Sequence, residues 1–339
     1  MEYSKERYFG LGSVPVGIGA VIEGWDIPQS EFRDPNRLPS VDFRTMTSAC
    51  PHDCFHCFTD KQKKTLNLEE VIKIIDQLAD MKAHSINFIG EGEPTIDPNF
   101  FDVIEYSSSK GIQPVIFTEG AARLRDKDFV RRLYKTGASV CFKCDSLWNP
   151  EYQNWVVRDR KGKYFEERDE AINILISEGF NKIEDDGTTR MGFDMVVTKR
   201  NMHEVEKTLR YCRENNLWII FAYFLPSGRS GSEDFDNSLT PSQSDKEEIS
   251  EMVRSVDNEY DFHHEVLNNF LTGVCVEFMQ IYGDGSVSPC PGNETRVGNV
   301  KTSTIKELQH KILEKYPSHN RANRCGSCLY RPLVRPVMS

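Results

Sequence analysis

The chain has 339 residues, of which 38% are hydrophobic and 28% are charged. These fractions are ordinary for a globular protein, and the length is sufficient for one large barrel or for two domains. The formal net charge of −10 argues against a nucleic-acid surface, because neutralising phosphates requires clustered lysine and arginine. We therefore expect no nucleic-acid partner.

The first residues, MEYSKERYFG, are charged and lack the apolar region of a secretory signal. No stretch of the chain approaches the ~18 apolar residues of a membrane span. Ten cysteines are present, and their short spacings are typical of intracellular metal ligands rather than of disulfides. These features predict a cytoplasmic protein that has no membrane partner.

Strand and helix patterns alternate from about residue 41 to residue 226. The expected strands are 41–47, 85–89, 114–118, 138–145, 191–198 and 218–225. The expected helices lie between them, at 67–79, 97–110, 127–135, 166–178 and 203–215, and the first begins with an Asn67–Glu70 capping box. Six such repeats predict an α/β fold, a partial (β/α)6 TIM-like barrel, with its chemistry at the C-terminal ends of the strands.

The remaining segments differ in character from the barrel. Residues 1–39 contain several glycines but no phosphate-binding GK[ST] sequence, so we interpret them as an N-terminal extension or cap. The barrel is expected over 40–226. A polar connector and helices should follow over 227–270, and a small C-terminal domain over 271–339.

Three cysteines with the spacing C-x3-C-x2-C follow the first expected strand, at Cys50, Cys54 and Cys57. A [4Fe–4S] cluster normally takes four protein thiolates, so three would leave one iron open to another ligand. A zinc site normally closes with four protein ligands, and His52 or His56 could supply the fourth. The spacing alone leaves both metals open.

A second motif, Gly90-Glu91-Gly92-Glu93-Pro94, follows the second expected strand, and the turn containing Thr118 and Glu119 follows the third. The carboxyl ends of parallel strands meet at one edge of a sheet. We therefore expect these two segments to lie beside the cysteine loop.

The two motifs, in this order, resemble the radical S-adenosylmethionine (SAM) superfamily over about residues 40–226. The resemblance implies that Cys50, Cys54 and Cys57 hold a [4Fe–4S] cluster and that SAM chelates the open iron through its methionine amino and carboxylate groups. It also implies reductive cleavage of SAM to a 5′-deoxyadenosyl radical, which takes a hydrogen atom from a substrate.

The same resemblance implies roles for individual residues. Glu93 is expected to bind the methionine ammonium, although a solvated loop carboxylate is the alternative. Many members have glycine at the position of Glu91 and an aromatic residue at the position of His56, and the second departure leaves the adenine contact open. The full set of residues implied in SAM binding is Gly90, Glu91, Gly92, Glu93, Pro94, Thr118, Glu119, Lys143, Asp145 and Ser146.

Cys141 and Cys144 form a C-x-x-C sequence on the fourth expected strand. Residues i and i+3 of a strand point to opposite faces, so these thiols cannot readily share a metal. We expect them to be small buried residues, with Lys143 and Asp145 on the same face as Cys141. Asp194 on the fifth strand is a weaker candidate for the site, and Cys212 is expected in the core of a helix.

The last seventy residues contain a further cysteine group, Cys275, Cys290, Cys325 and Cys328. Its glycine–cysteine spacing resembles the SPASM/twitch extension of radical SAM enzymes, which implies a small α+β domain holding one auxiliary [4Fe–4S] cluster. Four thiolates would saturate that cluster, which favours electron transfer over substrate ligation. A zinc ribbon held by the same cysteines is the alternative.

Three hypotheses about function follow. The first is an enzyme acting on a small polar biosynthetic substrate, such as a sugar, aminocyclitol or nucleoside, by dehydrogenation, dehydration or a related step. The second is a maturase that crosslinks or epimerises a ribosomally made peptide. The third is a non-catalytic Fe–S or zinc protein, which the second motif argues against. For either enzyme the resemblance implies an electron donor such as flavodoxin or ferredoxin, and no motif marks a catalytic acid or base.

Overall fold

The fold is taken from a computed structural model. It describes residues 34–44, 46–57, 59, 61, 64–184, 189–224, 237–260, 279–289 and 295–315. Most of the N-terminal extension and the last 24 residues therefore lie outside the described part.

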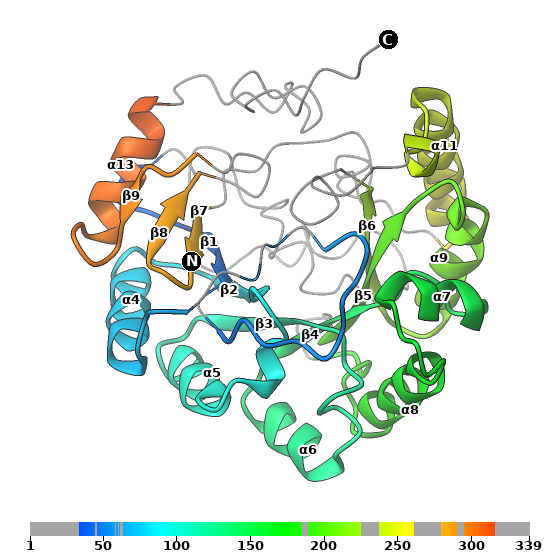
Figure 1. The fold of residues 1–339 in the computed structure, drawn as a ribbon, viewed down its shortest axis with the longest axis horizontal. Coiled ribbons are helices and arrows are strands. Elements are labelled where there is room, and N and C mark those ends of the chain that lie inside the picture. Colours follow the sequence, from blue (N-terminus) through cyan, green and yellow to red (C-terminus); the bar gives the residue numbers. More distant parts are fainter. Residues whose placement is uncertain are drawn as a thin grey trace.

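Six parallel strands form the centre of the structure and confirm the predicted partial barrel. They are β1 (Ser40–Arg44), β2 (Ser85–Phe88), β3 (Gln113–Thr118), β4 (Ser139–Lys143), β5 (Met191–Val197) and β6 (Trp218–Tyr223). Each strand pairs with the next in sequence order, and the sheet curves into an arc (Figure 1). The parallel arrangement brings the carboxyl ends of all six strands to one edge.

Helices cover the outer, convex face of this arc (Figure 1). Those of the barrel are α4 (Leu68–Asp80), α5 (Phe100–Ser109), α6 (Lys127–Lys135), α7 (Pro150–Val157), α8 (Tyr164–Ser177) and α9 (Val205–Glu214). Short 3-10 turns lie at Pro94–Ile96, Met202–Glu204 and Asn237–Leu239. Among the described residues, no helix is both long enough and apolar enough to span a bilayer.

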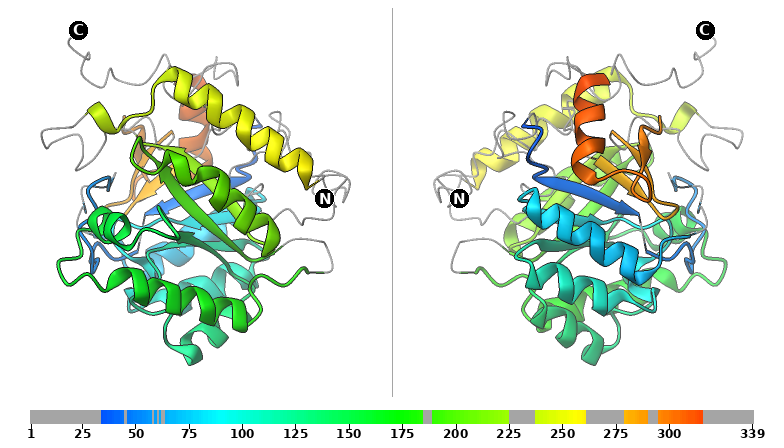
Figure 2. Two further views of the ribbon diagram at one scale, coloured as in Figure 1. Left: turned by 90° about the vertical axis from the view of Figure 1, so that its right-hand side faces the viewer. Right: turned by 90° about the vertical axis from the view of Figure 1, so that its left-hand side faces the viewer.

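Three further strands extend the same sheet beyond β1, within the segment where a small α+β domain was expected. β7 (Met279–Tyr282) pairs parallel with β1, and β8 (Ser286–Ser288) and β9 (Gly298–Asn299) follow antiparallel. Helix α13 (Ile305–Lys315) packs against α4, and α11 (Gln243–Glu259) packs against α9 (Figure 2). The described strands between residues 279 and 299 are thus joined to the first barrel strand.

The two faces of the sheet carry different side chains. Alternate residues such as Phe43, Phe88 and Phe193 enter the main core under the outer helices. The opposite, inner face carries a separate apolar cluster made of Val115, Phe117, Cys141, Trp218 and Ile220. The period-2 alternation of strands therefore separates a structural core from an inner face that is available for chemistry.

Gly192 makes room for one member of this inner cluster. A β-carbon at Gly192 would lie 2.0 Å from the Trp218 indole, whose residue is its register partner on β6. Glycine is therefore required at this position so that the indole can lie across β5.

Most predicted boundaries agree with the observed elements to within a few residues. The Asn67–Glu70 capping box is confirmed, with both reciprocal hydrogen bonds present. Helix α5 begins at Phe100, later than predicted, because the Asp97 carboxylate accepts the Asn99 N–H (2.8 Å) and the Lys64 ammonium (3.0 Å) in a turn before the helix. Helix α7 was not predicted at all.

Candidate functional site

The cysteine loop after β1 and the Gly90–Pro94 loop after β2 are hydrogen-bonded to each other. The backbone N–H of Gly92 donates to Thr47 O (3.0 Å), and that of Glu93 donates to Ala49 O (2.8 Å). The Thr59 hydroxyl adds a third bond, to Glu91 O (2.9 Å). The expected contact between the two motifs is therefore present, and it is made by main-chain groups.

Glycine is needed at two positions for this contact. A β-carbon on Gly92 would lie 2.0 Å from Ala49 O, closer than any real contact. Gly90 has φ of +71°, in the left-handed region that favours glycine. Gly90 and Gly92 thus serve to bring the two loops together.

The three thiols lie half-buried in this loop. Burial raises the pKa of Cys50 to about 11 and that of Cys54 to about 12, and the neighbouring Cys50 and Cys57 add to the shift at Cys54. The Cys57 sulfur lies 3.3 Å from the Thr59 hydroxyl oxygen. Such thiols remain protonated unless a nearby positive charge, such as a metal, stabilises the thiolates.

Glu93 lies buried between the second and third strands. One carboxylate oxygen accepts hydrogen bonds from Thr95 N (3.0 Å), Thr95 Oγ1 (2.6 Å) and Thr118 Oγ1 (2.7 Å), and the other accepts one from Glu119 N (2.9 Å). Burial, together with the adjacent Glu119 carboxylate, raises the pKa of Glu93 to about 7. The pair of carboxyl groups makes this position favourable for a cation.

Glu119 connects the turn after β3 to the cysteine loop through His52. The His52 Nε2 and Glu119 Oε2 atoms are 3.0 Å apart, and the carboxylate also accepts the N–H groups of Ala121 (3.1 Å) and Ala122 (2.7 Å). The Tyr164 hydroxyl donates to Glu119 O (2.8 Å), and its ring meets His52 edge-on at 4.6 Å. We predicted from the sequence that Glu119 lies beside the cysteine loop, but the residues that it contacts were not predicted.

A buried charged group lies at the ends of β4 and β5. Lys143 Nζ is 3.3 Å from Asp145 Oδ1, and His56 Nε2 is 3.6 Å from the same oxygen, which is too long for a good hydrogen bond. Burial and the nearby lysine lower the pKa of His56, so the imidazole is neutral. Although burial opposes it, Lys143 holds the pKa of Asp145 below its usual range.

Asp194 belongs to the same group, since it is the register partner of Lys143 on β5. Burial raises the pKa of Asp194, and Lys143 only partly offsets that effect. The inner face here therefore offers an ammonium group and a carboxyl group side by side.

The inner face next to β1 is also polar. Asp42 accepts hydrogen bonds from Asn87 (3.0 Å) and Gln280 (3.1 Å), which joins β1, β2 and β7. The Arg44 guanidinium lies 3.8 Å from Glu91 and over the ring of Tyr282. Glu91, which stands where many members of the family have glycine, thus has an ion-pair partner on β1.

The remaining predicted residues occupy structural positions. Cys141 lies on the inner face and Cys144 in the outer core, which confirms that the two thiols point apart. Cys212 is fully buried in α9, as predicted. The Ser146 hydroxyl donates to Glu204 (2.5 Å) and accepts the Asn149 N–H (2.9 Å), so its polar atoms are already engaged.

Helix α7, which the sequence analysis missed, lies directly against the cysteine loop. The N–H groups of Asp53 and Phe55 donate to Val157 O (3.3 Å) and Val156 O (3.0 Å), one on each side of Cys54. The signal for this helix was present, because Asn149 before Pro150 is a typical helix start and the Asn149 side chain does accept the Tyr152 N–H (2.9 Å).

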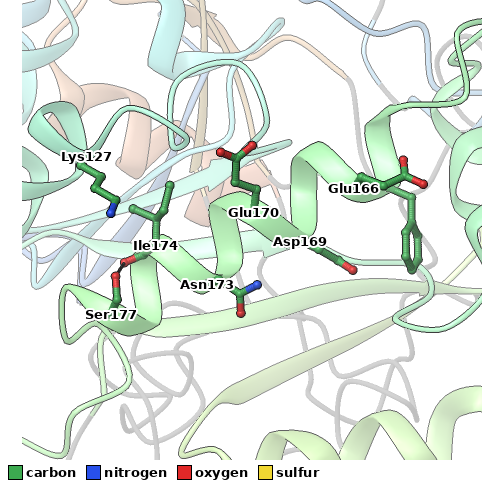
Figure 3. A pocket seen from close by; sticks show the side chains of 8 residues that line it. Lys127, Glu166, Asp169, Glu170, Asn173, Ile174 and Ser177 are labelled. Carbon is green, nitrogen blue, oxygen red and sulfur yellow. Dashed lines mark hydrogen bonds between the residues drawn. The ribbon is translucent and has the colours of Figure 1, made fainter.

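A separate shallow groove runs along α8 on the outer helix layer (Figure 3). Its lining residues are Lys127, Phe165, Glu166, Asp169, Glu170, Asn173, Ile174 and Ser177. None of them is among the residues predicted from the sequence to bind a metal or cofactor. We therefore place the candidate site at the strand ends and not in this groove.

The residues at the strand ends suit an iron–sulfur cluster and a cationic cofactor. Three thiols share one loop, and a buried carboxyl pair lies beside them, although in the described residues no three His, Cys, Asp or Glu side chains are gathered closely enough to hold a metal ion. The two histidines that could complete a zinc site face carboxylates instead: His52 faces Glu119, and His56 faces Asp145. The second cysteine group, Cys275, Cys290, Cys325 and Cys328, lies outside the described residues.

Comparison with known proteins was made against family models, curated proteins and solved structures. A model described as the Radical SAM superfamily matches residues 45–212. Mycofactocin maturase MftC of Mycobacterium tuberculosis (strain CDC 1551 / Oshkosh) is 23% identical over 194 residues, which are 54% of this chain and 44% of the maturase. The chain thus spans less than half the length of that relative.

A second relative is the S-adenosylmethionine-dependent nucleotide dehydratase of Flammeovirga pacifica, which is 26% identical over 215 residues, 60% of this chain and 69% of the dehydratase. Among solved structures, native anSMEcpe with bound AdoMet and Cp18Cys peptide has a TM-score of 0.62 at 20% identity, and the match covers 81% of both chains. This structural likeness supports the partial-barrel fold.

The close contact at Gly92 leads to a first prediction. Gly92→Ala should force the two loops apart, because the added methyl group would overlap Ala49 O. We expect the variant to fold, with a loss of about 1–3 kcal/mol in the free energy of unfolding, and to retain less than half of the wild-type iron after anaerobic reconstitution.

The matched control is Gly137→Ala, at a glycine whose φ is +78° and whose added methyl group would meet nothing within 4 Å. This variant should show a loss in the free energy of unfolding similar to that of Gly92→Ala, and it should retain the iron content of the wild type. Equal iron retention in the two variants would show that the loop contact does not support metal binding.

Proposed function

Because residues 45–212 of this chain form a radical SAM domain, we propose that the protein cleaves S-adenosylmethionine reductively and takes a hydrogen atom from a small polar substrate. The observation that carries the proposal is the main-chain contact between a three-thiol loop and the Gly90–Pro94 loop. This contact brings the loop that carries the three proposed metal ligands next to a buried acidic position, an arrangement that would suit a chelating cationic cofactor.

Cys50, Cys54 and Cys57 are the proposed ligands of a [4Fe–4S] cluster with one open iron. The cluster, when bound, supplies the electron that breaks the sulfonium S–C bond of SAM. Support for three protein ligands comes from His52 and His56, whose imidazoles face carboxylates just after β3 and β4. A fourth protein ligand would have to displace one of these pairs.

Glu93 is the proposed partner of the methionine ammonium of SAM. Its carboxyl group is buried with a pKa of about 7, and an ammonium ion beside it would favour the ionised form. Lys143 is suited to an anionic group such as the methionine carboxylate, and Asp145 holds it in place (3.3 Å). Gly90, Pro94 and Thr118 shape the position of Glu93.

The polar inner face supports a small polar substrate. Asp194 and Lys143 lie on adjacent strands at one wall, and Arg44 with Tyr282 lies at the other. These groups suit hydroxyl, amine or carboxylate substituents, such as those of a sugar, an aminocyclitol or a nucleoside. The similarity to a nucleotide dehydratase over 60% of the chain is in accord with this class.

A peptide substrate is the second candidate. One relative is a maturase of mycofactocin, and one structural neighbour was solved with a peptide. Transfer of deuterium into 5′-deoxyadenosine, either from a labelled small polar compound or from a labelled precursor peptide, distinguishes the two.

We also propose that Cys275, Cys290, Cys325 and Cys328 hold one auxiliary [4Fe–4S] cluster in a twitch-type C-terminal domain, over about residues 271–339. Support comes from their spacing in the sequence. Strand β7, which lies next to β1, would bring the start of this domain close to the barrel.

Cleavage of SAM tests the central proposal. We expect the anaerobically reconstituted protein, reduced with dithionite, to form 5′-deoxyadenosine and methionine, measured by liquid chromatography. Cys54→Ser should lower the rate at least about 100-fold, because a cluster with two thiolates no longer binds stably.

The control for this measurement is Cys212→Ala, which removes a buried thiol in α9 and should leave cleavage near the wild-type rate. A fully loaded wild-type protein that forms no 5′-deoxyadenosine would refute the proposal, as would stoichiometric zinc in place of iron.

The pKa of Glu93 predicts how SAM binding depends on pH. An ammonium ion binds the carboxylate better than the neutral acid, and Glu93 becomes protonated as the pH falls through about 7. We expect the Kd of SAM, measured by equilibrium dialysis, to rise about fivefold between pH 7 and pH 6.

Glu93→Gln should bind SAM more weakly and with little pH dependence in the same range, because the titrating group is gone. A wild-type affinity that is constant, or that improves, below pH 7 would contradict the assigned role.

Metal content tests the auxiliary cluster. Two [4Fe–4S] clusters correspond to about eight iron and eight sulfide ions per chain, and Cys290→Ser should retain about half of each. About four irons together with one zinc in the wild type would favour the zinc ribbon instead.

A further inference from the structure

The turn between α7 and α8 is strongly basic in a chain whose net charge is −10. Its sequence is Arg158-Asp-Arg-Lys-Gly-Lys163, with four cations and one carboxylate. All four cationic residues of this turn are exposed. A local positive patch on an acidic protein creates a field that attracts a negatively charged partner.

The turn is held in one conformation by its single carboxylate. Asp159 accepts the backbone N–H groups of Lys161 (2.9 Å), Lys163 (2.7 Å) and Tyr164 (2.8 Å). Gly162 adopts φ of +64°, which closes the turn. The negative charge is therefore directed towards the backbone, and the cationic side chains lie on the outside.

Three of these cations have no ion-pair partner among the described residues: Arg160, Lys161 and Lys163. The exposed arginines of α6 differ in this respect. Arg131 pairs with Glu178 (3.1 Å), and Arg132 pairs with Glu105 (2.8 Å). Because these three charges have no ion-pair partner in the described residues, a negatively charged partner can bind them without breaking an existing ion pair.

The turn lies directly beside the cysteine loop. The last residues of α7 accept hydrogen bonds from both neighbours of Cys54, and Arg158 Nη1 lies 3.9 Å from Asp53. On the other side of the turn, Tyr164 contacts His52. A partner bound to the turn is therefore held next to Cys54.

An exposed aromatic side chain adjoins the same surface. Trp155 is 38% exposed, packs at a tilt of 36° against Phe55 of the cysteine loop (4.5 Å between ring centroids), and lies under the guanidinium of Arg200. Tryptophan and arginine are enriched among the residues that dominate protein–protein binding. The surface thus combines charge for association with an aromatic contact for affinity.

We propose that the basic turn 158–163, together with Trp155, is the docking surface for an acidic one-electron carrier of the flavodoxin or small-ferredoxin class. The inference rests on the proposed function, which requires one electron from outside the chain for each SAM cleaved. The reduced carrier would give up one electron, which the cluster would pass to the sulfonium; the S–C bond would break to give methionine and a 5′-deoxyadenosyl radical, and the carrier would leave oxidised by one electron.

Charge complementarity favours this partner over others. Nucleic acid is disfavoured by the net charge of the chain. An acidic segment of a precursor peptide would also be attracted to the turn. The turn, however, lies beside Asp53 and Phe55 in the outer part of the cysteine loop, whereas the proposed substrate groups, Lys143 and Asp194, lie on the inner face of the sheet.

The test is a charge reversal with two independent measurements. The variant is Arg160→Glu/Lys161→Glu/Lys163→Glu in the reconstituted protein, and the probe is a purified acidic flavodoxin. The first measurement is the Kd of the complex by calorimetry at low and moderate salt. The second is the rate of 5′-deoxyadenosine formation with reduced flavodoxin or with dithionite as the electron source.

We expect the wild-type Kd to rise with salt, and the variant to bind flavodoxin at least about tenfold more weakly at low salt. The flavodoxin-driven rate should fall by a similar factor, whereas the dithionite-driven rate should stay within about twofold, because a small reductant needs no docking surface.

The matched control is Lys82→Glu/Lys182→Glu/Lys306→Glu, which changes the net charge equally at exposed lysines before β2, before β5 and on α13. It should bind flavodoxin nearly as the wild type does. An equal loss of binding in the control would show that only net charge matters and would overturn the proposal.

Two other outcomes would also overturn it. The first is unchanged flavodoxin binding by the variant. The second is an unchanged flavodoxin-driven rate with a loss of substrate turnover, which would assign the turn to the substrate. Failure of dithionite to cleave SAM with the wild-type protein would refute the proposed function, while the flavodoxin Kd would still decide the docking surface.

Discussion

The candidate site depends on one interaction, the main-chain contact between the cysteine loop and the loop after β2. Two N–H groups, of Gly92 and Glu93, donate to carbonyl groups of Thr47 and Ala49. These bonds need no particular side chain, but they do need space, and Gly92 provides it. The contact fixes the backbone of the cysteine loop relative to the loop that carries the buried acid.

Around this contact, the two faces of the barrel sheet differ: the outer face is apolar, and the inner face carries the charged residues. The outer face of the strands packs under helices, and the inner face carries Asp42, Lys143 and Asp194 next to the apolar cluster of β3, β4 and β6. Charges of opposite sign lie close together here: the Asp145 and Asp194 carboxylates outweigh the effect of burial on the pKa of Lys143, and Lys143 partly offsets the effect of burial on the pKa of Asp194. Polar chemistry is thereby possible inside a stable fold.

Two further parts of the molecule support the cysteine loop, one that was not predicted, helix α7, and one that was, the turn at Glu119. Helix α7 accepts hydrogen bonds from Asp53 and Phe55, and Glu119 pairs with His52. The cysteine loop is thus held from β2, from β3 and from the segment between β4 and α8. The same arrangement brings the basic turn 158–163 next to the cysteine loop. The segment that supports this loop therefore also carries the proposed docking surface for an electron carrier.

Local patterns in the sequence determined the repeated strands and helices, the capping box at Asn67, and the divergence of Cys141 and Cys144, because each follows from periodicity or spacing along a short segment. They also determined which two loops would meet, since parallel strands end at one edge. Tertiary structure alone decided the partners of His52, His56 and Glu91, and the pairing of β7 with β1 across more than 230 residues. Those contacts join segments far apart in the chain, and neither partner carries a local signal that specifies the other.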